Sequence, residues 1–290
     1  MQYQAWRALQ FAGRRLPPAV LYRVAGLAGA AAYWTWPRGR QSTRRNFERV
    51  FGPGDARIRP AARRSLGNYC RYLVDFARLP TLDAAAVVAS CDGDEEFAAL
   101  DAVLARGAGA VFVCMHFGNW DMGAAAAAAR GYPVTAVGEG FSDSRVTREV
   151  FAAREGLGAT ILPLERAGPS LIRVLKKNGL LALLIDRSVP GQGVPAQFFG
   201  ATVEVPAGPA HLALRTGAAL IPAAFPRVRA DGPAVRVLAD FSIDTRRTGD
   251  HDADVRRLTQ QVMTAHEGFI RRYPAQWYKF RDMWETVGQA

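Results

Sequence analysis

The sequence predicts an α/β protein with a mainly parallel central sheet flanked by helices. From about residue 108 onward, short apolar runs alternate with segments of helical periodicity, the order expected of parallel strands connected by helices. Two of the runs, at 110–115 and 180–185, are continuously apolar, as strands buried on both faces are. The chain of 290 residues is 49% hydrophobic and 22% charged, which is typical of a globular protein with a full core and excludes a disordered or fibrous chain.

The first eighty residues differ from the rest in charge and pattern. They hold 15 arginines, no lysine and three acidic residues, a net charge of +12, whereas residues 81–290 have a net charge of −1. Within 61–78, apolar side chains recur at helical spacing. We therefore expect a basic helical region over 1–80 and an α/β domain over 81–290, which together form one structural unit. A basic excess confined to one region favours an anionic partner such as lipid, nucleic acid or an acidic protein.

An apolar segment at 19–36 lies inside this basic region. Residues 24–36 carry no charge, and at 1.5 Å per residue they span about 20 Å, less than the roughly 30 Å of a bilayer core. Arginines flank the segment on both sides, and Tyr33, Trp34 and Trp36 lie at its end. This pattern favours a helix lying in the headgroup plane of one leaflet. A signal peptide cleaved near 28–30 and an ordinary buried core helix are the alternatives.

Beyond residue 108 the elements can be placed one by one. We expect strands at 110–115, 133–137, 159–164, 180–185 and 219–225, an edge strand at 235–238, and helices at 124–130, 142–155, 170–178, 206–216 and 252–273. Ser142 is the expected N-cap of its helix, and the Gly/Pro-rich residues 187–197 are expected to form a loop. Ligands of such sheets bind at the carboxyl ends of the strands, so the polar residues that follow the apolar runs are the candidates for a site.

Cysteine and histidine usage limits the chemistry. Three cysteines without C-x-x-C spacing indicate neither a disulfide framework nor a zinc ribbon, and they fit a reducing compartment. The four histidines are scattered singly, which argues against a multi-histidine metal site. We therefore expect neither a metal ion nor a resident cofactor.

Two polar residues follow the continuous apolar runs directly: His116 after the first and Asp186 after the second. An imidazole at the edge of a parallel sheet is suited to act as a general base near neutral pH. Asp121, five residues after the histidine, is one candidate carboxylate to fix the imidazole tautomer, and Asp186 is the other if the two strands are neighbours. Gly118 and Asn119 lie where the next helix would begin, and backbone N–H groups there would receive an oxyanion.

The motif H-x4-D at 116–121, in the form HFGNWD, resembles the bacterial lipid A late acyltransferase family, which includes the actinobacterial phosphatidylinositol mannoside acyltransferases. Other segments within about residues 5–285 resemble the same family in the same order: an Arg-Asn-aromatic segment, a Glu and an Arg, a second acidic motif, an FFG stretch and a Trp-rich ending. They lie at 44–47 with 51, at 139 with 151–154, at 183–187, at 198–200 with 206–208, and at 277–280. The ordered set is more specific than HFGNWD alone.

The resemblance implies the α/β architecture of glycerolipid acyltransferases. It also implies transfer of a fatty acyl chain from acyl carrier protein or coenzyme A to a hydroxyl of a membrane glycolipid, of the lipid A or phosphatidylinositol mannoside type. His116 would take the proton of that hydroxyl, supported by Asp121 or Asp186. Many lipid A members carry Glu where this chain has Asp121, a departure that is compatible with the mannoside branch. The implied location is the cytoplasmic face of the inner membrane, with peripheral or monotopic attachment.

Further residues of the resembling segments are expected to bind substrate. Arg154 and Arg187 would bind phosphate groups, because a guanidinium offers bidentate donors, and Glu139 would position Arg154. Phe198 and Phe199 would line an acyl tunnel.

Two other functions remain open from the residues alone. A thioesterase or lysophospholipase would use the same histidine on water and would release free acid whether or not a lipid acceptor is present. A non-enzymatic module would bind an anionic membrane through the basic region and would not need His116. The sequence lacks the aromatic–basic pattern of an RNA-binding module, so we expect no nucleic-acid partner.

Overall fold

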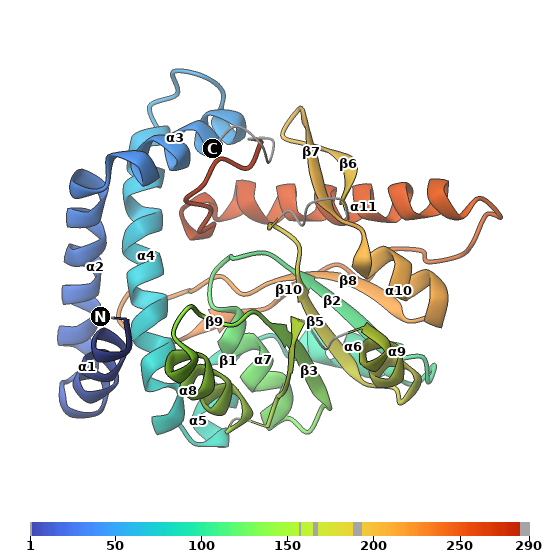
Figure 1. Cartoon of the computed structure of the whole chain (residues 1–290), viewed down its shortest axis with the longest axis horizontal. Coiled ribbons are helices and arrows are strands. Elements are labelled where there is room, and N and C mark those ends of the chain that lie inside the picture. Colours follow the sequence, from blue (N-terminus) through green and yellow to red (C-terminus); the bar gives the residue numbers. More distant parts are fainter. Residues whose placement is uncertain (1, 157, 165–167, 188–192, 285–290) are drawn as a thin grey trace.

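The computed structural model describes residues 2–156, 158–164, 168–187 and 193–284. Figure 1 shows helices on both faces of a central sheet, with the first helices gathered at one side. The helices are α1 (Gln2–Arg15), α2 (Pro18–Thr35), α3 (Pro37–Phe51), α4 (Ile58–Arg78), α5 (Ala84–Ala89), α6 (Asp94–Leu104), α7 (Trp120–Ala129), α8 (Ser144–Glu155), α9 (Gly168–Lys176), α10 (Gly208–Thr216) and α11 (His251–Arg272). The strands are β1 (Cys91–Asp92), β2 (Ala110–Cys114), β3 (Val134–Gly138), β4 (Thr160–Pro163), β5 (Leu180–Leu184), β6 (Gly193–Phe198), β7 (Ala201–Pro206), β8 (Ala219–Ala224), β9 (Val235–Arg236) and β10 (Leu238–Ala239).

The central sheet has six strands in the order β10-β8-β2-β5-β3-β4 (Figure 1). Its strands run parallel except β10, which pairs antiparallel with β8 at one edge. This confirms the predicted α/β class with a mainly parallel sheet. β2 and β5 are direct neighbours, and Cys114 lies opposite Leu184. The residues that follow these two strands therefore leave the sheet side by side.

Both faces of the central strands are buried, as their apolar runs predict. On one face Val111, Val113 and Leu181 belong to the large core that includes side chains of α10 and α11. On the other face Ala110 and Leu180 pack with side chains of α6 and α7. The alternation follows from the two-residue period of a strand, which points successive side chains to opposite faces.

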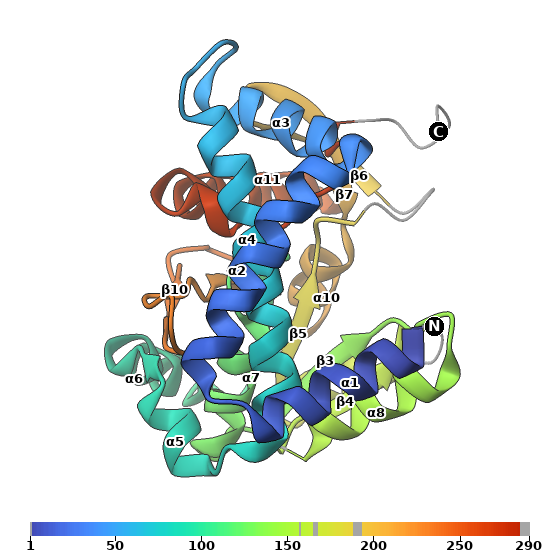
Figure 2. The ribbon, with the colours of Figure 1, turned by 90° about the vertical axis from the view of Figure 1, so that its left-hand side faces the viewer.

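The N-terminal helices form a layer of their own. Figures 1 and 2 show α2 and α4 side by side, and Figure 2 shows α1 running along α8. A Cβ on Gly29 of α2 would lie 2.4 Å from the Gly67 Cα of α4, so the close approach of the two helices requires glycine there. The face of α2 that packs on the protein consists of Leu21, Tyr22, Ala25, Gly29 and Tyr33. Among the described residues, no helix combines the length and the apolar character needed to cross a bilayer.

The structure corrects the expected loop at 187–197. Residues 193–198 form β6, which pairs antiparallel with β7 in a separate hairpin that contacts α11, while 188–192 lie outside the described residues. In β6 the buried Ala196 and Phe198 alternate with the exposed Pro195 and Gln197. The strand pattern is present in the sequence, but the Gly and Pro content of the segment obscures it.

Some element boundaries also differ from expectation. Helix α7 begins at Trp120 rather than 124, because the Asn119 side chain caps it by accepting a hydrogen bond from the Met122 N–H. The N-cap of helix α8 is Asp143, not Ser142. The Asp143 carboxylate accepts a hydrogen bond from the Arg145 backbone N–H at 3.0 Å. The expected edge strand at 235–238 divides into β9, which pairs with β1, and β10, which pairs with β8.

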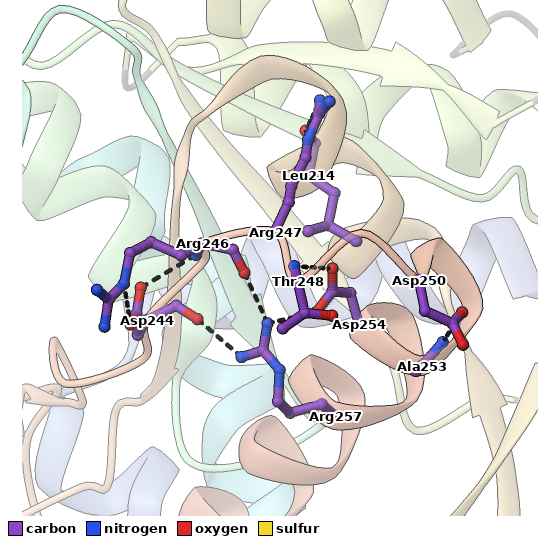
Figure 3. Close-up of polar contacts among 9 residues, drawn as sticks. All are labelled: Leu214, Asp244, Arg246, Arg247, Thr248, Asp250, Ala253, Asp254 and Arg257. Carbon is purple, nitrogen blue, oxygen red and sulfur yellow. Dashed lines mark hydrogen bonds and ion pairs between the residues drawn. The ribbon is translucent and has the colours of Figure 1, made fainter.

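A polar cluster fixes the segment before α11 (Figure 3). The buried Asp254 carboxylate accepts hydrogen bonds from the backbone and hydroxyl of Thr248 and from Arg257. Arg257 also donates to the carbonyls of Asp244 and Arg246. The cluster contains none of the predicted site residues, and it provides positions for control substitutions.

Candidate active site

His116 and Asp186 form a directly bonded pair at the ends of β2 and β5. The His116 Nδ1 lies 2.7 Å from one carboxylate oxygen of Asp186, and the His116 backbone N–H donates to the other at 3.0 Å. Asp186 is fully buried, whereas the His116 side chain is 19% exposed. With Asp186 ionised, Nδ1 carries the proton that is shared with the carboxylate, which leaves Nε2 free to accept a proton. This is the arrangement that a general base requires.

The charges around Asp186 keep it ionised. Burial raises the pKa of Asp186, but the charge and hydrogen bonds of His116 outweigh that effect, the charge of Lys279 adds to them, and the pKa lies well below its usual range. The Lys279 ammonium donates a hydrogen bond to the Asp186 carbonyl oxygen. A carboxylate that stays ionised can hold the imidazole in one tautomer and stabilise the imidazolium.

Asp121, the other candidate carboxylate, has different partners. Arg154 Nε donates to one of its oxygens at 2.6 Å, and the Tyr72 hydroxyl donates to the other at 2.6 Å. Burial lowers the pKa of Arg154, but the charge of Asp121 and its hydrogen bond outweigh burial and raise that pKa above its usual value. The structure therefore brings Asp186, and not Asp121, to the imidazole of His116.

The two arginines expected to bind phosphate are placed differently. Arg154 is partly buried in its pair with Asp121, and its guanidinium also lies 5.2 Å from the centre of the Phe76 ring. Arg187 is largely exposed and forms an ion pair with Glu139. The expectation that Glu139 positions Arg154 is therefore wrong: Glu139 and Arg187 follow β3 and β5 and pair with each other across the ends of these strands.

The turn after His116 does not offer the N–H groups expected for an oxyanion. Gly118 donates to the Gln276 carbonyl at 2.9 Å, and Asn119 donates to the Phe225 carbonyl at 2.8 Å. Gly118 has a φ of +65°, and a Cβ there would lie 2.0 Å from the Phe225 oxygen, so only glycine fits. The buried Asn119 side chain caps α7 and donates to Asp75. In this arrangement both residues build the turn, and their N–H groups are already satisfied.

Phe198 and Phe199 also lie elsewhere than expected. Phe198 is fully buried, with its ring centre 5.9 Å from that of Trp277, and the ring of Phe199 packs on that of Phe198 at 4.7 Å. Neither residue is among the described side chains that line the large cavity beside His116. They are core residues of the β6–β7 hairpin, and their rings pack on Trp277 of the C-terminal segment.

A cavity of about 730 Å³ opens beside His116. Its lining includes Phe112, Cys114 and Leu184 on one face of the sheet, and Ala124 and Ala127 of α7. The Phe225 ring fills the space beside Gly123, since a Cβ there would lie 2.3 Å from that ring, so the room along α7 comes from the short side chains of its alanines. Burial raises the pKa of the Cys114 thiol to about 12. Because the thiolate is the nucleophilic form, this thiol lines the cavity without being suited to act as a nucleophile.

Sequence reasoning missed two aromatic residues of this site. The Trp120 ring lies 5.2 Å from the His116 ring in an edge contact, and it packs on Tyr72 at 4.3 Å. Tyr72 lies in the segment of helical spacing at 61–78, so its pattern indicates only a core position. Its hydroxyl connects α4 to Asp121. Within the described ranges, no three His, Cys, Asp or Glu side chains lie together as a metal site would require.

Comparison with known proteins identifies the family. Residues 4–286 match the bacterial lipid A biosynthesis acyltransferase family. A phosphatidylinositol mannoside acyltransferase of Mycolicibacterium smegmatis is 33% identical over 287 residues, which cover 96% of this chain and 88% of that protein. A phosphatidylinositol mannoside acyltransferase of Mycobacterium tuberculosis is 31% identical over 263 residues, which cover 88% of this chain and 80% of that protein. The chain therefore belongs to the bacterial lipid A biosynthesis acyltransferase family and is an acyltransferase.

Proposed function

We propose that the protein transfers a fatty acyl chain from a thioester to a hydroxyl of a membrane glycolipid of the phosphatidylinositol mannoside type. The observation that carries this proposal is the His116–Asp186 pair at the side of an apolar cavity. The names of the two relatives, which share a third of their aligned residues with this chain, support the acceptor class.

The chemistry follows from the free Nε2 of His116. Nε2 takes the proton of the acceptor hydroxyl while the hydroxyl oxygen attacks the thioester carbonyl carbon. Asp186 stabilises the imidazolium that forms. When the tetrahedral intermediate collapses, the C–S bond breaks, and the imidazolium gives its proton to the leaving thiolate. The products are an ester and a thiol, and His116 returns to its starting state.

The cavity beside His116 is the proposed site of the acyl chain. Its walls are mainly apolar, and burying each methylene in such a site contributes about 0.8 kcal/mol. The acyl chain thus lies on the side of Cys114 and α7, not beside Phe198 and Phe199 as the sequence suggested.

The donor is a phosphopantetheine thioester, carried either by coenzyme A or by acyl carrier protein. Arg187 at the rim is exposed and is the arginine best placed to meet its phosphate, while Arg154 is engaged by Asp121. The two donors can be separated by salt. Raising the salt to about 0.5 M should raise the KM for an acidic carrier protein much more than the KM for acyl coenzyme A, because steering of a whole acidic protein is screened.

Attachment to the cytoplasmic face of the inner membrane through α2 is part of the proposal. The solvent-exposed part of α2 includes Val20, Val24, Leu27 and Trp34, with Leu27 71% exposed. Two arginines lie at its Trp34 end, with the guanidinium groups of Arg59 and Arg40 5.3 and 5.9 Å from the centre of the Trp34 ring. Exposed apolar side chains beside arginines fit an anionic lipid surface.

Vesicle binding tests this attachment. Val24→Glu combined with Leu27→Glu should reduce the fraction bound to vesicles containing anionic phospholipid by at least about fivefold, because two apolar side chains are lost from the interface. Val228→Glu, at an exposed apolar position outside the helical layer, is the matched control and should bind as the wild type does. Equal binding of the double variant and the wild type would contradict attachment through α2.

Product analysis tests the reaction itself. Purified wild type, given an acyl thioester and phosphatidylinositol mannoside, should produce the acylated glycolipid by mass spectrometry. His116→Ala should produce none while keeping the thermal unfolding profile of the wild type. Release of free fatty acid in place of acylated lipid would favour the thioesterase or lysophospholipase alternative. Wild-type turnover by His116→Ala would remove His116 from the mechanism.

A further inference from the structure

The C-terminal strap, defined here as residues 276–283, contacts both halves of the His116–Asp186 pair. The Tyr278 N–H donates to the His116 carbonyl at 2.8 Å, and the Lys279 ammonium donates to the Asp186 carbonyl. One short segment thus bonds to the turn after β2 and to the turn after β5.

The strap is itself firmly held. The buried Asn46 of α3 donates to the carbonyls of Lys279 and Arg281 at 2.9 and 2.8 Å and accepts from the Met283 N–H at 3.0 Å. The buried Ser65 of α4 donates to the Trp277 carbonyl at 2.7 Å. These bonds tie the backbone on both sides of Lys279 to the N-terminal helices. Its ammonium therefore extends from a fixed base.

We propose that Lys279 is a positioning residue for the reaction: its ammonium holds the Asp186 carbonyl so that the Asp186 carboxylate stays directed at the imidazole of His116. The proposal rests on the function proposed above, in which His116 is the base.

The surroundings of Lys279 support a charged contact with that turn. Burial lowers the pKa of Lys279, and the charge of Asp186 acts in the opposite direction. The charges of Arg187 and Arg281 lower this pKa further, whereas the charge of Asp282 raises it. A partly buried ammonium near two arginines needs a strong hydrogen-bond acceptor to stay charged. The Asp186 carbonyl is that acceptor. Lys279 is not one of the described residues that line the cavity beside His116. Its contact with the pair is the hydrogen bond to the Asp186 carbonyl, so in this proposal Lys279 acts through Asp186.

The experiment compares Lys279→Met, Lys279→Arg and the control Lys177→Met, which removes an exposed lysine that follows α9. Methionine keeps the length of the side chain but cannot donate, whereas arginine restores a charged donor. Lys279→Met should lower kcat about tenfold while KM for the acyl donor stays within about twofold, because a positioning residue affects the transition state more than binding. Lys279→Arg should recover most of the kcat, and Lys177→Met should match the wild type.

Thermal unfolding of each variant separates positioning from folding. A kcat of Lys279→Met equal to that of the wild type would overturn the proposal. Equal losses in Lys279→Met and Lys279→Arg, together with lowered unfolding temperatures, would also overturn it, because Lys279 would then serve only the fold. His116→Ala, assayed in parallel, distinguishes the two proposals. If that variant is inactive and Lys279→Met is fully active, only the role of Lys279 fails, whereas an active His116→Ala removes the proposed base itself.

Discussion

Two buried carboxylates, Asp186 and Asp121, lie within one site and have different partners. Asp186 is bonded to His116, whose ring nitrogens can each donate or accept a hydrogen bond. Asp121 is bonded to Arg154, whose charge is permanent, and to the hydroxyl of Tyr72. We therefore expect the first pair to take part in proton transfer and the second to hold α4, α7 and α8 together. The partners of the two carboxylates, more than their burial, therefore distinguish the roles that we expect of them.

The comparison also shows how sequence distance misleads. Asp121 follows His116 by five residues, whereas Asp186 follows it by 70. Because α7 begins at Trp120, Asp121 lies in its first turn and reaches α8 and α4. The parallel pairing of β2 with β5 brings the distant residue to the imidazole.

The largest difference between the carboxylates should appear in Asp186→Asn. Asparagine has nearly the shape of aspartate, but its amide cannot both accept from the His116 backbone and stabilise an imidazolium. Single-turnover rates of acyl transfer should fall by about 10³-fold, while the far-UV circular dichroism stays that of the wild type. A loss of less than about tenfold would remove Asp186 as the supporting carboxylate.

Asp121→Asn should have the opposite effect: it should lower the stability of the fold more than it slows acyl transfer. Loss of the carboxylate charge leaves Arg154 with a weaker partner in a buried place, so the free energy of unfolding should fall by about 2–3 kcal/mol. The single-turnover rate should fall by less than about tenfold, since the His116–Asp186 pair is intact. Urea unfolding measures the first quantity, with Arg257→Ala in the cluster of Figure 3 as a structural variant that should not slow turnover of folded protein. A rate as low as that of Asp186→Asn would erase the distinction between the two carboxylates.

The smallest effect is expected from Tyr72→Phe. This change removes only the hydroxyl that donates to Asp121, while the ring contact with Trp120 remains. The free energy of unfolding should fall by about 1 kcal/mol, the value of one hydrogen bond, and kcat should stay within about twofold of wild type. A large loss of kcat without loss of stability would show that the Asp121 cluster shapes the reacting geometry directly.

The sheet and the dyad could be predicted because local patterns determine them. Continuous apolar runs identify the buried strands, and a polar residue directly after such a run identifies the edge where a ligand would bind. His116 and Asp186 are therefore visible in the sequence. Which carboxylate meets the imidazole depends on strand order, and periodicity does not encode strand order.

Other features depend on contacts between distant segments. Gly118 donates its N–H to Gln276, far along the chain, so the sequence around HFGNWD does not reveal that this N–H is occupied. Phe198 is an aromatic residue in a family-like motif, but the packing of β6 on α11 makes it a core residue. Lys279 belongs to the site only because the C-terminal strap returns to the ends of β2 and β5.

In the proposed mechanism, Asp186 holds the proton-bearing Nδ1 of His116. Nuclear magnetic resonance of protein labelled with ¹⁵N-histidine measures this directly, and His116→Ala assigns the signal. A strongly downfield Nδ1 proton should be present in wild type and in folded Asp121→Asn, and absent in Asp186→Asn. Survival of that signal in Asp186→Asn, or its loss in folded Asp121→Asn, would contradict the account.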